Sequence, residues 1–386
     1  MFPSPAFGTR AAIVMLLAAV IALAICNLGS YEAFHAFWSA PLASGELLGG
    51  RVLTTGGFVN QGLMAIFFFL MGLRIKHEVL RGSLASLKTA SLPAFAAIGG
   101  VVVPVAVYLL CCSGHAEARA GWGIPTATGV AFAIGIMALR SKGSESAEEA
   151  VLGSAALVGD VMTLLVVAAY TRDLDIIWLV ISLALFAVAL VLNRKGVKAL
   201  LPYLLLGPIL WFCVFRSDVH PTLAGVLLAV AIPDGKPADS SRETPAQVLI
   251  RTLAPWVFFL IVPLFALSNS AINLVGTNLG GLLSDPVFLG CFLGLLAGKP
   301  LGIFLTSLLA MKLKMAALPK GCTRMGIARV GFFCGIGFPM AIFVASLAFT
   351  DGAALDAARA GILLASLASG LVGVLLPAGK ASQIRS

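Results

Sequence analysis

The chain has 386 residues, of which 60% are hydrophobic and only 11% are charged, and its mean hydropathy is +1.03. No soluble domain of this length needs so much apolar surface, so the composition excludes a soluble globular protein and predicts an integral membrane protein. The net charge of +9 would by itself fit a nucleic-acid-binding protein. In a membrane protein, however, the position of the basic residues matters more than their total, so no nucleic-acid partner is predicted.

Twelve apolar segments follow one another along the chain, and most have the length of about 17–25 residues that a membrane-spanning helix needs. They lie at 11–28, 58–75, 90–112, 121–139, 150–170, 176–193, 200–215, 220–233, 248–273, 287–311, 327–349 and 358–377. The eighth segment is short and crosses the membrane only if its neighbours extend it. The aromatic stretch between the first two segments is expected to lie at the membrane interface or to form a short hairpin.

The lysine and arginine residues support this count. If the N-terminus is cytoplasmic, 20 of the 26 basic residues lie on the cytoplasmic side, five lie on the opposite side, and Lys299 lies inside a span. A miscounted helix would swap the sides of every later loop, so a bias that persists along the chain favours twelve spans with both termini in the cytoplasm. We therefore predict an all-α integral membrane protein with a single polytopic membrane domain over residues 1–386.

Two charged residues lie at mid-membrane depth. Asp160 is about ten residues from either end of the fifth span, or roughly 15 Å from each interface, and Lys299 in the tenth span is as deep. A charged side chain at this depth costs at least about 2.5–3.5 kcal/mol and usually faces a bundle interior or a watery cavity. A structural salt bridge is one reading of the pair. Hydrophobic side chains usually serve stability as well as a buried ion pair does, so the pair favours an ion or proton pathway.

Two spans carry helix-breaking residues near their middle. The fourth span has several glycines and Pro125, and the eleventh has Gly335, Gly337 and Pro339. Glycine and proline are common in membrane helices in general, where glycine allows close packing. Each of these segments, however, is the middle member of a group of three, spans 3–5 and 10–12, and the two groups start on opposite sides of the membrane. Discontinuous helices (here spans 4 and 11) in inverted-topology repeats predict a secondary transporter.

Six stretches that run almost from end to end carry a resemblance to a known family. They are "LMAIFFFLMGLRIKHEVLRGSLAS" (63–86), "PTATGVAFAIGIMAL" (125–139), "VHPTLAGVLLA" (219–229), "APWVFFLIVPLFALSN" (254–269), "GKPLGI" (298–303) and "CGIGFPMAIFVASLAF" (334–349). With them the chain resembles the NhaA family of sodium/proton antiporters. That family is itself one of the known inverted-repeat transporters.

The resemblance implies the fold, the activity and the roles of particular residues. Spans 4 and 11 would be discontinuous and would cross midway, and Na⁺ or Li⁺ would leave the cell while protons enter. Asp160 and Thr128 would bind the ion or the proton, with Asp160 as the ligand of the transported Na⁺, and Lys299 would be the charge partner. The crossing of the broken helices would be formed by Gly129, Gly335, Gly337 and Pro339.

The chain departs from the family pattern where the chemistry lies. Family members carry two adjacent aspartates in span 5, where this chain has Gly159 before Asp160. An aspartate of the broken span 4 is here Gly129, and a threonine of span 11 is here Pro339. A dehydrated Na⁺ needs oxygen ligands and a negative charge that offsets its desolvation. One acid in place of two or three therefore predicts weaker binding and a lower coupling ratio, with Asp160 exchanging between Lys299, a proton and a cation.

A cluster at the cytoplasmic end of the second span lies where the family places its pH response. It contains Arg74, His77 and Glu78 in "GLRIKHE", where the family reads "GLEIKRE", and His220 also matches the family pattern. A histidine titrates in the physiological range when its surroundings do not perturb it. The alternative is that these are ordinary basic residues at the cytoplasmic end of a helix, and that His220 is structural or solvated.

The sequence thus predicts a Na⁺(Li⁺)/H⁺ antiporter of the NhaA type that works by alternating access and serves pH and sodium homeostasis. The alternative is a transporter of the same fold with altered or lost sodium coupling. An intramembrane aspartyl protease needs two facing aspartates, and Asp160 is the only mid-span carboxylate, so no enzyme activity is predicted. No cofactor is expected. The expected partners are Na⁺ or Li⁺, H⁺, the lipid bilayer of the bacterial cytoplasmic (inner) membrane, and a second copy of the chain, since the family dimerises between spans 1 and 2.

Overall fold

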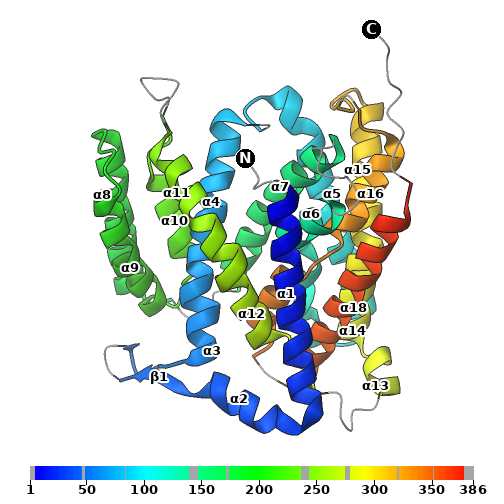
Figure 1. Ribbon diagram of the computed structural model, residues 1–386, viewed down its shortest axis with the longest axis horizontal. Helices are drawn as coiled ribbons and strands as arrows, with labels where there is room; N and C mark the ends of the chain where they lie inside the picture. Colours follow the sequence, from blue (N-terminus) through cyan, green and yellow to red (C-terminus); the bar gives the residue numbers. More distant parts are fainter. Residues whose placement is uncertain are drawn as a thin grey trace. The chain divides into compact units, whose positions relative to one another are not determined.

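The computed structural model describes residues 5–45, 48–82, 84–138, 147–170, 174–235, 243–273, 279–319, 321–350 and 352–377 (Figure 1). In these ranges eight helices are long and apolar enough to cross a membrane, over Phe7–Ser39, Thr55–Arg81, Thr89–Cys111, Ala147–Ala169, Ile176–Arg194, Pro245–Asn269, Pro286–Lys312 and Ala353–Leu375. One further apolar pair, Ala118–Thr126 with Val130–Met137, is bent by 47° at its break. The chain is therefore a multi-pass helical membrane protein.

Shorter helices correspond to the other predicted spans. Helices α9 (Leu201–Arg216) and α10 (Leu223–Ala231) follow one another, and α16 (Arg324–Cys334) and α17 (Met340–Ala348) flank the predicted interruption of the eleventh span. Twelve spans and the inverted repeat remain predictions. The ends of the chain, 1–4 and 378–386, lie outside the described residues, and so does the prediction that both termini are cytoplasmic.

The chain divides into two compact units. The first unit comprises Met1–Leu17, Ser83–Thr163 and Ile272–Ser386, and the second comprises Ala18–Gly82 and Leu164–Ala271. Helices α1 (Pro5–Ile25) and α7 (Ala147–Ala169) each contribute to both. The expectation of one polytopic membrane domain over 1–386 stays a prediction.

The first unit is held together by close contacts between its helices. Its other elements are α5 (Leu87–Cys111), the 3₁₀ segment η4 (Ala118–Thr126), α6 (Val130–Ala138), α13 (Leu279–Ser284), α14 (Pro286–Leu293), the π-helical turn η6 (Gly294–Gly298), α15 (Lys299–Lys312), α16, α17 and α18 (Ala353–Leu375). Helices α5 and α15 touch at Gly99 and Gly302, where a Cβ on Gly302 would lie 2.0 Å from the Gly99 carbonyl oxygen. Small residues at such a contact let membrane helices approach closely.

The second unit packs in the same manner. Its elements are η1 (Cys26–Ser30), α2 (Tyr31–Ser39), β1 (Pro41–Ser44), β2 (Val52–Thr54), α3 (Thr55–Gly57), η3 (Phe58–Leu63), α4 (Met64–Arg81), α8 (Ile176–Arg194), α9, α10, α11 (Pro245–Trp256), η5 (Val257–Ile261) and α12 (Val262–Asn269). A Cβ on Gly225 of α10 would lie 2.1 Å from the carbonyl oxygen of Ala65 in α4. Glycine at this position therefore allows the two backbones to touch.

A short β-hairpin is the one sheet among the described residues. Strands β1 and β2 pair antiparallel, with Pro41 opposite Thr54 and Ser44 opposite Val52. The hairpin follows the aromatic helix α2, so the stretch between the first two predicted spans contains a helix and a hairpin. The hairpin is an exception to the all-α fold that the sequence predicted. The β-branched residues Val52 and Thr54 of β2 favour an extended strand.

Candidate functional site

The fourth predicted span is interrupted between Thr126 and Val130. Segment η4 ends at Thr126, α6 begins at Val130, and the two are bent by 47°. Pro125 lies in the last turn of η4, and Ala127 behind it is extended, with φ −71° and ψ 149°. Because the helix stops here, the last carbonyl groups of η4 lose the donors that the next turn would have supplied.

The eleventh predicted span is interrupted in the way that the sequence suggested. Helix α16 ends at Cys334 and α17 begins at Met340, so Gly335, Gly337 and Pro339 lie in the break. Pro339 has no N–H to donate and disfavours a helical conformation of the residue before it. The N–H of Phe338 donates to Ser366 Oγ of α18 at 3.1 Å, so a side chain of a neighbouring helix satisfies this backbone group.

The two interruptions meet within the first unit. The N–H of Gly129 donates to the carbonyl oxygen of Ile336 at 2.7 Å. The rings of Phe132 and Phe338 pack edge to face, with 5.8 Å between their centroids and 81° between their planes. The breaks of α6 and α16 are therefore joined by a backbone hydrogen bond and an aromatic contact, and Gly129, Gly335, Gly337 and Pro339 lie in this region.

Lys299 supplies donors to the broken end of η4. The residue begins α15, and only 2% of it is exposed. Its ammonium donates to the carbonyl oxygen of Thr126 at 2.7 Å and also to that of Ala127. A positive charge at the C-terminal end of a helix is stabilised by the helix dipole, and charge-assisted hydrogen bonds are stronger than neutral ones. Lys299 therefore compensates the carbonyl groups that the break leaves.

Asp160 belongs to the same buried region. It lies in α7, where 5% of the residue is exposed, and its charge acts on Lys299 and on the Cys334 thiol at the end of α16. Thr128, which lies next to Gly129, is buried as well. The sequence suggested Asp160 as the partner of Lys299, and the hydrogen bonds of the ammonium to two carbonyl oxygens were not foreseen.

Gly129 and Gly159, which stand where the resemblance would place acids, have opposite surroundings. A Cβ on Gly129 would lie 1.8 Å from the carbonyl oxygen of Phe338, so no side chain fits there without a backbone shift. Among the described residues, no atom outside its own helix backbone and its chain neighbours lies within 4 Å of a Cβ on Gly159. Position 129 therefore has no room for a side chain, because the backbone of Phe338 fills the space, whereas position 159 has room for one.

The sequence analysis missed a buried ion pair in the first unit. Arg329 of α16 donates to Glu148, in the first turn of α7, with 2.6 Å between Nη1 and Oε2. The side chains are 4% and 9% exposed. Arg329 also donates from Nε to the carbonyl oxygen of Gly373 in α18 at 3.2 Å, so one guanidinium connects three helices. Arg329 is one of the 20 basic residues that the sequence assigns to the cytoplasmic side, and such an assignment predicts no partner.

The predicted pH-response cluster lies in the second unit, where it includes a further carboxylate. His77 Nδ1 lies 3.0 Å from Asp234 Oδ2, and Asp234 Oδ1 accepts from Thr244 Oγ1 at 2.6 Å. Lys76 donates to the Val230 carbonyl oxygen at 2.6 Å. Asp234 was not predicted, because its sequence position after α10 does not reveal that it reaches α4.

The four residues of this prediction do not form one cluster. Arg74 is buried in α4, and Glu78 lies against the end of that helix, 1.9 Å from where a Cβ on Gly82 would be. His220 precedes α10, whereas Asp234 follows it, so a nine-residue helix of about 14 Å separates them. His220 Nδ1 lies 2.7 Å from Thr222 Oγ1 beside it, a local contact.

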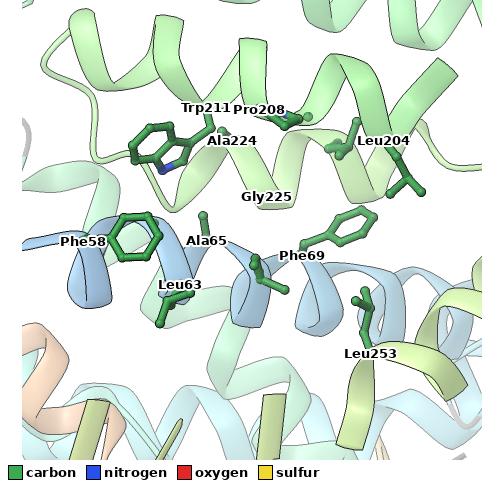
Figure 2. Close-up of a pocket in the computed structure, with 14 residues that line it drawn as sticks. Phe58, Leu63, Ala65, Phe69, Leu204, Pro208, Trp211, Ala224, Gly225 and Leu253 are labelled. Carbon is green, nitrogen blue, oxygen red and sulfur yellow. The ribbon is translucent and has the colours of Figure 1, made fainter. Parts of the chain in front are cut away.

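The second unit also contains an apolar pocket of about 490 Å³. Figure 2 shows Phe58 and Phe69 on one side and Trp211 and Leu204 of α9 on the other. None of the described residues that line the pocket carries a charged or titratable side chain. It therefore offers no ligands for a small cation, and the polar crossing in the first unit is the better candidate for ion binding.

The crossing combines a single carboxylate with neutral oxygen atoms. The described residues contain no group of three or more histidine, cysteine or acidic side chains that would hold a metal ion. Asp160 provides one carboxylate, Lys299 one positive charge, and the two breaks provide carbonyl and hydroxyl oxygens. Oxygen atoms are the ligands that hard cations prefer, and a single buried carboxylate holds either a proton or a cation more readily than both.

Comparison with known proteins gives an extensive match. Residues 6–376 match the model of the family described as Na⁺/H⁺ antiporter 1. A protein of Shewanella loihica named Na(+)/H(+) antiporter NhaA is 47% identical over 319 residues, which cover 82% of this chain and 81% of that protein. Proteins of the same name from Shewanella pealeana and Escherichia coli are 44% and 41% identical, over 94% and 96% of this chain and 92% and 95% of their own length.

Proposed function

Because the chain belongs to the Na⁺/H⁺ antiporter 1 family, we propose that it exports Na⁺ or Li⁺ in exchange for protons by alternating access. The observation that carries this proposal is Asp160, a carboxylate buried in the same unit as the two broken helices and under the electrostatic influence of Lys299. The role in the cell would be the homeostasis of intracellular pH and sodium. The site would lie in the cytoplasmic membrane of a bacterium.

The exchange would take place on Asp160. In one state the carboxylate is ionised and binds the dehydrated cation together with nearby oxygen atoms, including that of Thr128. In the other state a proton neutralises it. The ammonium of Lys299 caps the carbonyl oxygens of Thr126 and Ala127 and acts electrostatically on the carboxylate. Because a proton and a cation compete for one group, the outward movement of one is coupled to the inward movement of the other.

The finer topology is part of this proposal. Twelve spans with both termini in the cytoplasm are supported by the distribution of lysine and arginine. An inverted repeat of spans 3–5 and 10–12 is supported by the two interruptions, each of which lies in the middle span of its group. A homodimer formed through the stretch between spans 1 and 2 is supported by the exposed hairpin strand β1. The surrounding lipid is supported by the many exposed apolar side chains.

A pH response would arise in the second unit. His77 and Asp234 are in contact, Arg81 donates to the Asp234 carbonyl oxygen at 3.0 Å, and Lys76 lies on the same turn of α4 as His77. His77 is charged only when protonated, and its contact with Asp234 is then an ion pair between α4 and the segment after α10. Arg74 and Glu78 flank this contact on α4, and His220 would act separately at the other end of α10.

The closed position at Gly129 favours a second candidate function. A transporter of the same fold with altered or lost sodium coupling would no longer need an acid there, and the Phe338 carbonyl oxygen occupies that place. The two candidates differ in one measurable property, which is whether Na⁺ moves protons across the membrane.

The experiment uses purified protein in proteoliposomes that carry a preformed pH gradient and a fluorescent pH indicator. Na⁺, Li⁺ or K⁺ is added at pH values stepped from acid to alkaline. Proton movement with Na⁺ or Li⁺ that Asp160→Asn abolishes would support the proposal. The matched control is Asp356→Asn, which removes an exposed carboxylate of the same unit and should leave the flux unchanged. Absence of flux from folded wild-type protein would overturn the proposal and would favour the second candidate.

A further inference from the structure

The dipeptide Lys299-Pro300 interrupts the regular α-helical hydrogen bonding between η6 and α15. The backbone N–H of Lys299 donates to the carbonyl oxygen of Gly294, five residues back, which makes η6 a π-helical turn. Pro300 has no N–H. The carbonyl oxygen of Leu295 therefore loses its regular helical donor, because the residue four positions on is committed to Gly294 and the residue five positions on is proline. Such π-bulges occur frequently at functional sites.

This carbonyl oxygen is directed at the break that follows α16. It lies 2.6 Å from the position that a Cβ on Gly335 would take. Ser369 Oγ of α18 lies 2.8 Å from the same position. Two oxygen atoms from two different helices therefore converge on the backbone of Gly335 and are at most about 5.4 Å apart, a separation that one bridging water molecule can span.

The hydroxyl group of Ser369 is the second observation that points to a ligand. Ser369 is completely buried, and among the described residues its Oγ has no hydrogen-bond partner. A hydroxyl group buried without a partner is destabilising, so such a group usually binds an ordered water molecule or an ion. Ser366, one turn earlier on the same face of α18, already accepts the N–H of Phe338. The face of α18 turned towards the break is therefore polar at two successive positions.

We propose that the Leu295 carbonyl oxygen and the Ser369 hydroxyl group form a second oxygen site for the transported cation, on the α16 side of the crossing. The inference rests on the proposed antiport. Both ligands are neutral, so this site does not add to the charge that Asp160 provides. It supplies hard oxygen ligands that replace part of the hydration shell of Na⁺ or Li⁺.

Lys299 and Pro300 thereby each affect one of the two interrupted spans. The side chain of Lys299 holds the carbonyl oxygens at the end of η4, and Pro300 leaves the Leu295 carbonyl oxygen available at the break after α16. Pro300 itself packs against α16, since a Cβ on Gly331 would lie 2.9 Å from its Cα. A movement of α15 would therefore change the ligands on both sides of the crossing together.

The test compares apparent KM values for Na⁺ and Li⁺ in proteoliposomes at several pH values. Ser369→Ala removes the hydroxyl group, and we expect it to raise KM about five- to tenfold and to leave the maximal rate within about twofold, because the lost contact is to the bound ion. Ser369→Cys keeps the size of the side chain but offers a soft sulfur ligand, so it should behave like Ser369→Ala. The control is Ser307→Ala in α15, which removes another fully buried hydroxyl group that has no partner among the described residues.

The possible results separate this inference from the proposed function. Wild-type KM values in both Ser369 variants, with active transport, would overturn the second site and leave the antiport standing. Slower proton movement with an unchanged KM for Na⁺ would mean that the site holds water only, which also overturns it. If the wild type moves no protons, the proposed function fails. The second site is then tested by the increase in melting temperature that Na⁺ or Li⁺ gives the purified protein. The inference requires this increase in Ser307→Ala and a smaller increase in Ser369→Ala. Equal increases in the two variants, or none in either, would overturn it.

Discussion

Replacement of Gly129 by alanine tests whether the crossing depends on direct backbone contact. In the structure a Cβ at this position would lie 1.8 Å from the Phe338 carbonyl oxygen, well inside the 3.0 Å that real Cβ atoms respect. Relief of the clash must separate the two breaks and strain the 2.7 Å hydrogen bond from Gly129 to Ile336. Overpacking costs about 1–3 kcal/mol, and buried backbone groups left unpaired cost about 1–3 kcal/mol more, so the variant should lose about 2–6 kcal/mol of stability.

The measurement is the melting temperature of the purified protein in detergent, with Gly159→Ala as the matched control. Gly159 lies within α7, and no described atom beyond its own helix backbone and its chain neighbours would contact its Cβ. Alanine in a helix interior is more stable than glycine by about 0.5–1 kcal/mol, so the control should melt slightly above wild type. The aspartate variants should differ in the same direction: Gly159→Asp should melt at a higher temperature than Gly129→Asp. A Gly129→Ala protein that melts at or above the wild-type temperature would refute the backbone contact.

Further predictions concern the buried charges and one thiol. Lys299→Met should lower stability by about 2–4 kcal/mol, because two buried carbonyl oxygens lose their donor; an unchanged melting temperature would contradict this. Glu148→Leu or Arg329→Met alone should cost about 3–5 kcal/mol, whereas the double variant should recover most of this loss, and additive losses would argue against the ion pair. Burial raises the pKa of the Cys322 thiol to about 11, so its alkylation should be slow near neutral pH and accelerate as the pH approaches that value. Labelling of Cys322 as fast as that of an exposed thiol would be inconsistent with its burial.

Much of the fold could be predicted because it depends on local chemistry. Runs of apolar residues must be helical in a bilayer, since no water is present to satisfy the backbone. The breaks at Pro125 and Pro339 follow from the missing N–H of proline, and the structure has helix ends at both places. The hairpin of β1 and β2 was foreseen only as one of two options, because its strands are short and apolar patterning does not distinguish them from an interfacial segment.

The candidate site was only partly visible in the sequence. Asp160 and Lys299 stood out because a charge in an apolar run is expensive wherever its partner lies. Glu148 lies in the first turn of α7 and Asp234 follows α10, so neither stood out in the sequence, because a charged residue near a helix end needs no explanation. Arg329 lies at the start of the predicted eleventh span, 327–349, and did not stand out for the same reason, although in the structure it is in the middle of α16. Their partners come from distant parts of the chain.

The sequence by itself determined that this protein is a multi-pass membrane protein, that two of its helices are broken, and that one acid and one lysine lie within long apolar runs. Each of these follows from the cost of placing a residue in lipid or in a helix, which is a property of the residue. Only the tertiary structure decided that Lys299 binds the end of η4, that Gly129 is closed while Gly159 is open, and that Ser369 faces Gly335. These facts depend on the distance between atoms of helices that are remote in sequence, and such distances exist only once the helices have packed.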